Sequence, residues 1–206
     1  MLRFSCAASF ALECVPTFRE QCPETELLTQ RCHTPKAKED LILGRSDIGV
    51  LLTADLQHSA LEYLPLWTSE LMLAVPENHE PLPENELAAG DYHRVGDDNF
   101  ILTHAPSFGR DAEEHVLRHM GIQPKIICEV EENISRCYML NKGIGNAFVP
   151  SHVLQPDDHF HTYSLQPPYR FHIVAAYPKS ITLSEPMKCL IRLLLNHFEQ
   201  NWQSIR

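Results

Sequence analysis

The 206-residue chain holds 17 Lys and Arg against 27 Asp and Glu, for a formal net charge of -10, and 44% of its residues are hydrophobic. This length suits one large domain or two lobes, and a folded chain of this size buries roughly 70% of the surface that the extended chain exposes. The composition excludes a disordered chain. No run approaches the roughly 18 apolar residues of a membrane span. The acidic balance argues against a direct grip on nucleic-acid phosphates, which needs clustered Lys and Arg.

Seven cysteines are scattered along the chain without any C-x-x-C pair. Structural zinc sites use such close pairs, so we expect no zinc here. Scattered cysteines in a chain of this size are typical of reduced core residues in a cytosolic protein. No apolar signal stretch follows Met1, so we expect a cytoplasmic location. A chain that begins at a core strand is also typical of a fragment whose upstream part was removed.

The first half alternates strands and helices. Residues 3–7 form a strand candidate, and apolar residues at helical spacing after Ser9 predict a helix that Pro23 ends. Residues 26–32 form the second strand candidate, and residues 47–52 form a short apolar run typical of a buried parallel strand.

The helix predicted between the strands over 26–32 and 47–52 has clear start and stop signals. Thr34 is predicted as its cap, Pro35 as its first residue and Gly44 as its end. Its predicted inner face consists of Ala37, Leu41 and Ile42.

A strand over 71–75 and a linker over 81–84 close the first half, and the rhythm then restarts. The later predicted elements are strands over 100–103, 126–130, 147–149 and 171–176 and helices over 109–120, 134–141 and 184–202. Two similar α/β halves indicate two lobes with parallel sheets and a cleft, and ligands of open α/β sheets sit outside the carboxyl ends of the strands.

The motifs of common enzymes are missing. The chain has no G-x-S-x-G elbow and no phosphate-binding glycine loop, and we interpret Gly143 to Gly145 as a helix stop. The acidic and histidine cluster over 157–161 is interpreted as a solvated loop rather than a metal site. His115 and His119 lie one helical turn apart and are interpreted as part of a surface helix.

Three hydroxyl residues, Ser9, Thr34 and Ser107, each stand just before an expected helix. Helix starts offer free N–H groups that suit a carboxylate or another small anion. Each hydroxyl can equally cap its own helix, and both interpretations stay open.

The order of these segments resembles the C-terminal effector-binding domain of LysR-type transcriptional regulators over nearly the whole chain. The segments that carry the resemblance are CAASFALECVP (Cys6–Pro16), RCHTP (Arg31–Pro35), GRSDIGV (Gly44–Val50), LMLAVPENHEPL (Leu71–Leu82), PSFGR (Pro106–Arg110) and the run from Gly121 to Pro150.

The resemblance implies an α/β fold of two Rossmann-like lobes with a ligand cleft between them, similar to type 2 periplasmic binding proteins. The first lobe would comprise residues 1–80 plus 168–206 and the second residues 81–167. The winged helix-turn-helix that normally precedes such a domain is expected to be absent from this chain. Homodimers or homotetramers are expected, without a membrane, with DNA contacted only through that missing part.

By position in the family, a small effector would contact ten residues. These are Ser9, Phe10, Thr34, Pro35, Leu52, Thr53, Ser107, Phe108, Asn133 and Asn146. Ser9 and Thr34 would be the main hydroxyl donors, with Asn133 reaching in from the second lobe. No catalytic residue, metal or cofactor is expected.

The chain departs from the family pattern at several positions. His33 replaces the usual Asn, Cys32 the preceding Gly, and Glu132 a frequent Ser. Glu132 adds negative charge near the expected site, which disfavours a simple carboxylate effector. Asn146 stands where Ile or Val is usual, and it either alters ligand choice or bonds a backbone group.

The resemblance implies a ligand-sensing regulatory domain that binds a small, anionic effector and passes the signal through dimer contacts. Two alternatives remain on the same fold: a stand-alone small-molecule-binding protein and a cytosolic enzyme. Effector, operator and direction of regulation are not encoded in any motif. Cys6, Cys14 and Cys32 are interpreted as buried thiols, the alternative being the redox response known in a peroxide-sensing branch of the family.

Overall fold

The structure is a computed structural model that describes residues 1–80, 82, 86–87 and 92–203. The chain forms two compact units. Unit 1 comprises Met1–Thr68 and Phe171–Arg206, and unit 2 comprises Ser69–Arg170. The chain passes from one unit to the other within two strands, β4 (Leu61–Pro76) and β10 (Tyr169–Pro178). Among the described residues, no helix has the length and apolar character needed to cross a membrane.

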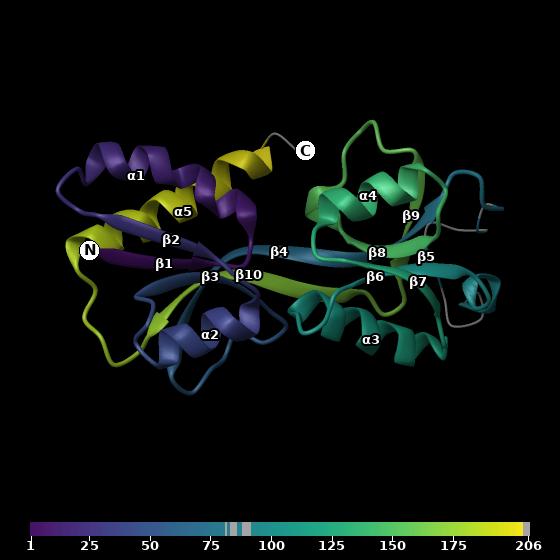
Figure 1. Ribbon diagram of the computed structural model, residues 1–206, viewed down its shortest axis with the longest axis horizontal. Helices are drawn as coiled ribbons and strands as arrows, with labels where there is room; N and C mark the ends of the chain where they lie inside the picture. The colour runs from purple at the N-terminus through teal and green to yellow at the C-terminus, as the bar shows by residue number, and fades with distance from the viewer. Residues whose placement is uncertain (81, 83–85, 88–91, 204–206) are drawn as a thin grey trace. The chain divides into compact units, whose positions relative to one another are not determined.

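Unit 1 is a sheet covered by helices on both faces. Its strands run in the order β2 (Leu27–Arg31), β1 (Leu2–Cys6), β3 (Ile48–Thr53), β10 and β4, and the first three are mutually parallel. The helices α1 (Val15–Gln21) and α5 (Glu185–Gln203) cover one face, and α2 (Thr34–Ile42) covers the other (Figure 1). The strand β3 is apolar and almost wholly buried because helices cover both of its faces.

The carboxyl ends of the three parallel strands meet at one edge of unit 1. Cys6 pairs in register with Arg31 on one side and with Val50 on the other. The helix α2 approaches β3 closely at Gly49, where an added Cβ would lie 3.3 Å from the Leu41 Cδ1 atom. Glycine therefore allows α2 to pack directly on the sheet.

Unit 2 repeats this layered plan. Its strands run in the order β4, β8 (Asn146–Pro150), β6 (Asn99–Thr103) and β7 (Lys125–Val130), with β6 parallel to both β7 and β8. Figure 1 shows α3 (Phe108–Met120) and α4 (Asn133–Asn141) on opposite faces of this sheet. Smaller elements complete the unit: β5 (Glu86–Leu87), β9 (Phe160–Leu165), η2 (Tyr92–Val95) and η3 (Ser151–Val153).

Several predicted elements differ from those observed. The helix predicted after Ser9 begins as a 3-10 helix, η1 (Ser9–Cys14), before α1. Ile42 was predicted to face inward but is 51% exposed, because Ala37 and Leu41 already define the buried stripe and Ile42 lies about 100° around the helix from Leu41.

Two strand segments were not predicted. The strand β4 begins at Leu61, ten residues before the predicted Leu71, and β9 includes Phe160 and His161, which we had placed in a loop. The predicted linker over 81–84 lies outside the described residues apart from Leu82.

Candidate functional site

Ser9 and Arg31 form a hydroxyl–cation pair at the carboxyl edge of unit 1. Arg31 is the last residue of β2, and its Nε atom donates to the Ser9 Oγ atom over 3.1 Å. Both residues are exposed. The N-cap of η1 is Ala8, so the prediction that Ser9 caps a helix is wrong, since its oxygen is used by Arg31 instead.

Thr34 follows β2 in the chain as the first residue of α2 and is buried. His33, not Thr34, is the N-cap, which makes Thr34 the first and Pro35 the second residue of the helix. The Thr34 Oγ1 atom accepts a hydrogen bond of 3.1 Å from the backbone N–H of Leu52. The hydroxyl therefore ties α2 to the end of β3 rather than capping its own helix.

The other predicted residues of unit 1 have different surroundings. Thr53 closes a tight turn, because its hydroxyl donates to the Asp55 carbonyl at 2.8 Å and accepts from the Asp55 N–H at 3.3 Å. The Phe10 ring packs edge-on against Phe198 of α5, with centroids 5.2 Å apart. Pro35 is exposed and Leu52 is half-buried.

The structure distinguishes two kinds of hydroxyl at this edge. Ser9 and Thr34 each accept a hydrogen bond, from Arg31 and from Leu52, and their own hydrogens have no acceptor in the described part of the chain. Thr53 has already donated its hydrogen to Asp55. Ser9 and Thr34 can thus donate to a ligand, and an anion is what two donors and a guanidinium would bind.

In unit 2, Ser107 is the N-cap of α3, as predicted. Its Oγ atom accepts from the Arg110 N–H at 3.1 Å and donates to the His104 carbonyl at 2.9 Å. Phe108 follows as the first helical residue and is half-buried. With both roles of its hydroxyl occupied, Ser107 is a structural cap.

A buried charged network lies next to this cap. The Thr103 hydroxyl donates to the Glu113 Oε1 atom at 2.5 Å and accepts from the Arg136 Nη2 atom at 2.5 Å. The Thr103 N–H donates to the other carboxylate oxygen of Glu113 at 2.7 Å. Burial raises the pKa of Glu113, against the lowering effects of Arg136 and of the bonds from Thr103.

Arg136 connects this network to α4. Its Nη1 atom donates to the Asn133 Oδ1 atom at 3.1 Å and to the Phe148 carbonyl at 2.9 Å. Its Nε atom is buried and has no hydrogen-bond partner within the described residues. Asn133, the first residue of α4, is therefore held at the carboxyl ends of β6 and β7 by a residue that we had not predicted.

Asn146 lies at the other end of the sheet of unit 2. It pairs in register with Phe100, near the amino ends of β6 and β8. Its Nδ2 atom donates to the Asp98 Oδ2 atom at 2.8 Å, and the same oxygen is 2.9 Å from the His79 Nε2 atom. Asn146 bonds a side chain and not the backbone group that one of our two interpretations gave it, and the structure does not bring it together with Ser107 and Asn133.

Arg31, Arg110, Glu113 and Arg136 are polar site residues that the sequence analysis missed. The Arg110 guanidinium donates to the Thr103 carbonyl at 3.1 Å and to the Glu129 carboxylate at 2.5 Å, and this ion pair holds the pKa of Glu129 below its ordinary value. The available signal was position, because Arg31 lies near the carboxyl end of a predicted strand and Arg110 follows a predicted cap.

No group of three or more His, Cys, Asp or Glu side chains in the described ranges is placed to hold a metal ion. His115 and His119 are exposed on α3 and pack against the rings of Tyr169 and Tyr92.

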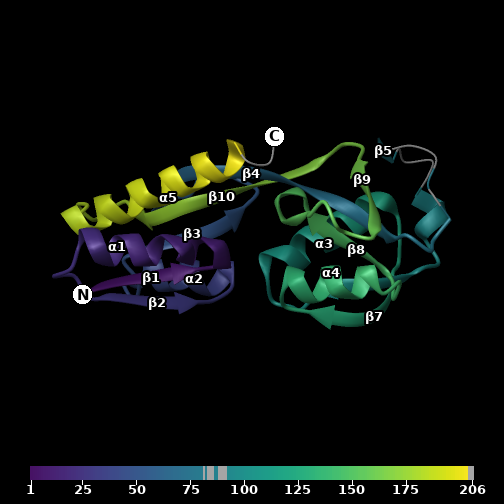
Figure 2. The ribbon, with the colours of Figure 1, turned by 90° about the horizontal axis from the view of Figure 1, so that it is seen from above.

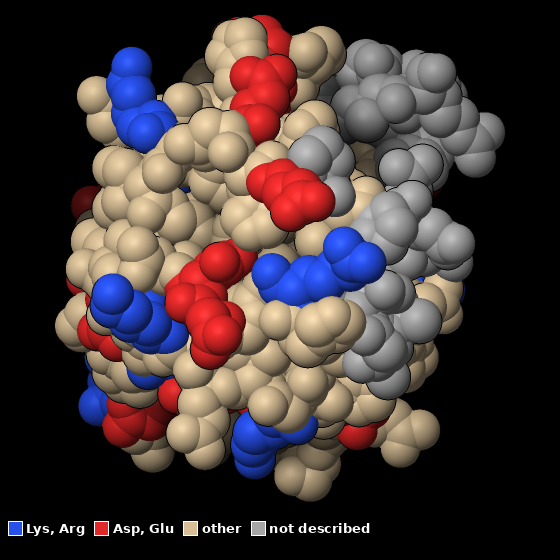
Figure 3. Space-filling model, turned by 90° about the vertical axis from the view of Figure 1, so that its right-hand side faces the viewer, with Lys and Arg blue, Asp and Glu red and all other residues tan. Residues whose placement is uncertain are grey.

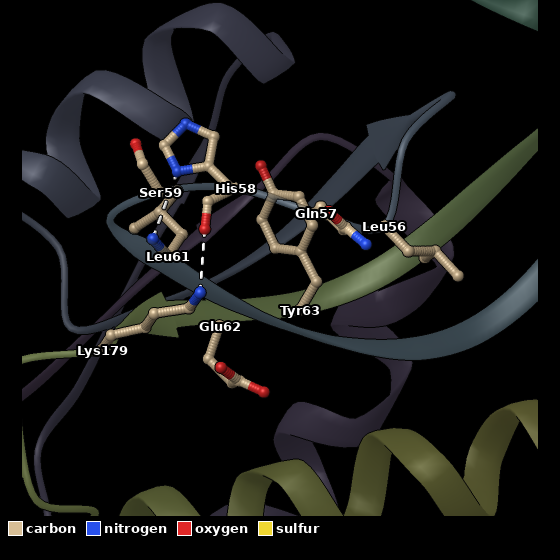
Figure 4. Close-up of a pocket in the computed structure, with 8 residues that line it drawn as sticks. All are labelled: Leu56, Gln57, His58, Ser59, Leu61, Glu62, Tyr63 and Lys179. Carbon is tan, nitrogen blue, oxygen red and sulfur yellow. Dashed lines mark hydrogen bonds between the residues drawn. The ribbon is translucent and has the colours of Figure 1, made fainter.

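Unit 1 also contains an open cavity of about 390 Å³, which none of the ten predicted residues lines (Figure 4). Its walls come from the loop before β4, the start of β4 and Lys179. The Lys179 Nζ atom donates to the His58 carbonyl at 2.9 Å, and the His58 Nδ1 atom accepts from the Leu61 N–H at 3.2 Å. The Tyr63 hydroxyl is buried and has no hydrogen-bond partner among the residues described.

The family model described as LysR substrate binding domain matches residues 2–199. The chain belongs to the LysR substrate-binding domain family. The predicted family and the predicted two-lobe α/β fold class are therefore confirmed, as is the function of an effector-binding regulatory domain. The family is one of transcriptional regulator domains.

Two curated relatives of this LysR domain come from Bacillus subtilis strain 168. The HTH-type transcriptional regulator AlsR is 28% identical over 141 residues, and the uncharacterized HTH-type transcriptional regulator YybE is 24% identical over 136 residues. Each alignment covers 66% of this chain and 45% of the relative, so the chain matches less than half the length of these regulators.

Solved structures show the same fold. The regulatory domain of the Neisseria meningitidis LysR family regulator MetR has a TM-score of 0.80 at 15% identity and covers 97% of this chain and 94% of its own. The regulatory domain of CcmR from Synechocystis PCC6803, in complex with 2-PG, has a TM-score of 0.77 at 15% identity over 95% of both chains. The effector-binding domain of QuiR in complex with shikimate has a TM-score of 0.73 at 20% identity over 97% of both.

Proposed function

We propose that this LysR domain senses a small anionic effector and passes the signal to a DNA-binding segment of a longer regulator. The regulators that it matches extend well beyond the aligned stretch. The proposal of an anionic effector rests on one observation, the set of hydrogen-bond donors at the carboxyl edge of unit 1. These donors are the Arg31 guanidinium and the hydroxyl hydrogens of Ser9 and Thr34. Shikimate, found with the related QuiR domain, likewise carries a carboxylate.

The effector contacts that we propose come from both units. They comprise Ser9, Phe10, Arg31, Thr34, Pro35, Leu52 and Thr53 in unit 1 and Phe108 and Asn133 in unit 2. Ser107 is left out because its hydroxyl is committed to the cap of α3. Asn146 is left out because Asp98 occupies its amide at the amino ends of the strands. The effector can favour one conformational state of the domain over another only by as much as its affinity for the two states differs.

The proposed partner in signalling is a second copy of the chain. On α4, Ile134 is 76% and Tyr138 62% exposed, one helical turn apart. The neighbouring strand β7 ends the strand order of unit 2 and exposes Ile126 and Ile127. An apolar patch next to a sheet edge is typical of an interface between subunits.

The dimer has a direct test. Light scattering after gel filtration would report a dimer for the wild type and a monomer for a variant with Ile134→Glu and Tyr138→Glu. Ile181→Glu, at an exposed apolar position of unit 1, would stay dimeric. A wild type that is monomeric at about 100 µM would contradict the proposal.

DNA contact is assigned to a segment outside this chain, and the regulator is proposed to act in the cytoplasm. The net charge is -10. Figure 3 shows acidic and basic side chains interspersed among uncharged ones on the face that it draws. Such a face lacks the clustered cations that neutralise phosphates.

Effector binding is tested by a thermal-shift screen of carboxylates, amino acids, aromatic acids, phosphates and sulfate. A ligand at 100 times its Kd adds about 2.7 kcal/mol, or roughly 5–11 °C for a chain of this size. Arg31→Gln and Ser9→Ala are expected to remove the shift. Arg19→Gln, at an exposed position of α1, is the matched control and is expected to keep it.

A second control separates binding from capping. Ser107→Ala removes the α3 cap and should lower stability by about 1 kcal/mol while leaving the ligand shift intact, because its hydroxyl is already committed. A ligand shift that survives both Arg31→Gln and Ser9→Ala would place the anion site elsewhere.

A further inference from the structure

A half-buried amide side chain lies at the start of α4, the helix that packs on β7 and β8 of unit 2 (Figure 2). Asn133 is the first residue of this helix, and its Oδ1 atom accepts a hydrogen bond of 3.1 Å from the Arg136 Nη1 atom. The Asn133 Nδ2 atom has no acceptor in the described part of the chain. Among the buried side-chain atoms described, only the Tyr63 hydroxyl and the Arg136 Nε atom lack a partner, so the unpartnered Asn133 nitrogen is open to solvent.

The guanidinium of Arg136 fixes which way this amide faces. Arg136 is buried, and an arginine side chain donates hydrogen bonds but cannot accept them. If the Asn133 amide turned over, two sets of N–H groups would face each other with no acceptor between them. The guanidinium itself is held in place by the Phe148 carbonyl at 2.9 Å, the Thr103 hydroxyl at 2.5 Å and the Glu113 carboxylate at 3.3 Å. The amide oxygen therefore stays toward Arg136, and both amide hydrogens stay available to a ligand.

The surroundings of this amide decide what it can bind. The nearby hydroxyl groups of Thr103 and Ser107 have already donated their hydrogens, to a carboxylate and to a carbonyl. The amide N–H groups of Asn133 need an acceptor, and the guanidinium behind the amide polarises it and strengthens it as a donor. Glu131 and Glu132 precede Asn133 and are exposed, so a second negative charge on the ligand would be repelled here. An uncharged oxygen, a carbonyl or a hydroxyl, is the acceptor that fits.

We propose that Arg136 is a positioning residue, which holds the Asn133 amide so that unit 2 selects an effector with an uncharged oxygen acceptor. An ammonium group at the same place would meet two N–H groups and is rejected. The class of effector is then an oxo acid or a hydroxy acid with one carboxylate. This inference rests on the proposed function, because the carboxylate is assigned to Arg31, Ser9 and Thr34 of unit 1.

The orientation of the amide is tested first, without any ligand, by the thermal unfolding of two variants. Asn133→Asp keeps an oxygen toward Arg136, so its Tm is expected to lie within about 2 °C of the wild-type value or above it. Asn133→Leu is of similar size but cannot accept a hydrogen bond, and it is expected to lower Tm by roughly 3–8 °C. An Asp variant that loses as much as the Leu variant would overturn the orientation.

Selection is tested by calorimetric titration with two matched sets of acids. One set is pyruvate, propionate and alanine, and the other is 4-oxopentanoate, pentanoate and 4-aminopentanoate. Within each set the carbonyl is replaced by a methylene or by a carbon that carries an ammonium group. In at least one set the wild type is expected to bind the oxo acid about 3- to 10-fold more tightly than the alkanoate, and the amino acid more weakly still. Asn133→Asp is expected to reverse the order of the oxo acid and the amino acid.

Two further variants separate positioning from charge and from stability. Ser135→Asp adds the same charge as Asn133→Asp at an exposed position in the same turn, and it is expected to keep the wild-type order. Arg136→Lys keeps a positive charge beside Glu113 but lacks the planar fork that holds the amide. It is expected to bring the affinities for the oxo acid and the alkanoate within about twofold of each other, which a loss of stability alone would not do. If Arg136→Lys fails to fold, Asn133→Asp and Ser135→Asp still decide between the two outcomes.

Failure of this inference and failure of the proposed function give different results. Equal wild-type affinities within both sets, binding of none of the six acids, or the same change with Asn133→Asp and Ser135→Asp would each overturn the inference. A preference for the oxo acid that survives Arg31→Gln without loss of affinity would instead contradict the anion site of unit 1 and leave the role of Asn133 standing.

Discussion

Replacing Thr103 by Val tests how much the buried network stabilises unit 2. The Thr103 side chain is buried and links Glu113 to Arg136 through one hydroxyl, with both distances 2.5 Å. Val has nearly the same shape but neither donates nor accepts a hydrogen bond. The substitution therefore removes two hydrogen bonds to charged groups while leaving the packing nearly unchanged.

The expected loss follows from those two bonds. Each hydrogen bond to a buried charged group is worth about 1.5–3 kcal/mol. The loss is partly offset because the Arg136 Nη2 atom stays 3.3 Å from the Glu113 Oε1 atom and the Thr103 N–H still donates to Glu113. We expect Thr103→Val to lower the free energy of unfolding by about 2–4 kcal/mol, which corresponds to a Tm lower by roughly 6–12 °C.

Urea unfolding followed by circular dichroism at 25 °C measures this loss. Thr103→Ser is the control, since it keeps the hydroxyl and removes one methyl, and it is expected to cost about 1 kcal/mol. If Thr103→Val stays within about 1 kcal/mol of the wild type, or if Ser costs as much as Val, the hydroxyl does not bridge the two charges and the reasoning fails.

Three further substitutions probe other contacts. Gly109→Ala should destabilise unit 2 by about 1–3 kcal/mol in urea unfolding, because the new Cβ would lie 3.0 Å from the Thr103 Oγ1 atom; an unchanged midpoint would contradict this close approach. Tyr63→Phe should leave stability unchanged or raise it by up to about 1 kcal/mol, since the hydroxyl is buried without a partner in the described structure, and a clear loss would reveal one. Burial lowers the pKa of His152 to about 4, below the value near 6.5 in an unfolded chain. The stability that the neutral His152 side chain contributes is therefore fully present above pH 6.5 and is lost as the pH falls toward 4. Between pH 7 and 4 the free energy of unfolding of the wild type should therefore fall by about 3 kcal/mol more than that of His152→Gln. Parallel curves of unfolding free energy against pH would show that His152 takes up a proton as easily in the folded chain as in the unfolded chain.

Regular patterns made most of the fold predictable. The helix predicted over 184–202 is observed as α5, and a stripe of five buried residues runs along it: Met187, Leu190, Ile191, Leu194 and Phe198. Glycine ends a helix at Gly44, as predicted, and also at Gly121, and the two residues adopt φ of +66° and +69°. Local chemistry decides such features, so the sequence alone sufficed.

Features that depend on distant partners were not predictable. The hydroxyl of Thr34 follows the pattern of a helix cap, yet it bonds the N–H of Leu52, 18 residues away. The strand β4 contains Pro65 and an exposed middle, which hid its first half from a search for apolar runs. Glu113 was unremarkable on an amphipathic helix until Arg136, 23 positions later, proved to be its partner.

The same distinction applies to anion recognition by this domain. Helix starts first suggested the site, but His33 and Ala8 occupy the N-cap positions and Ser107 has its hydroxyl committed. The donors at the carboxyl edge of unit 1 are the Arg31 guanidinium and the hydroxyl hydrogens of Ser9 and Thr34, so the charge of Arg31 must supply most of the attraction. An exposed guanidinium is screened by salt, whereas the hydroxyl groups are not. Effector affinity in the wild type should therefore weaken as the salt concentration rises, and Arg31→Gln should remove most of that salt dependence along with most of the affinity.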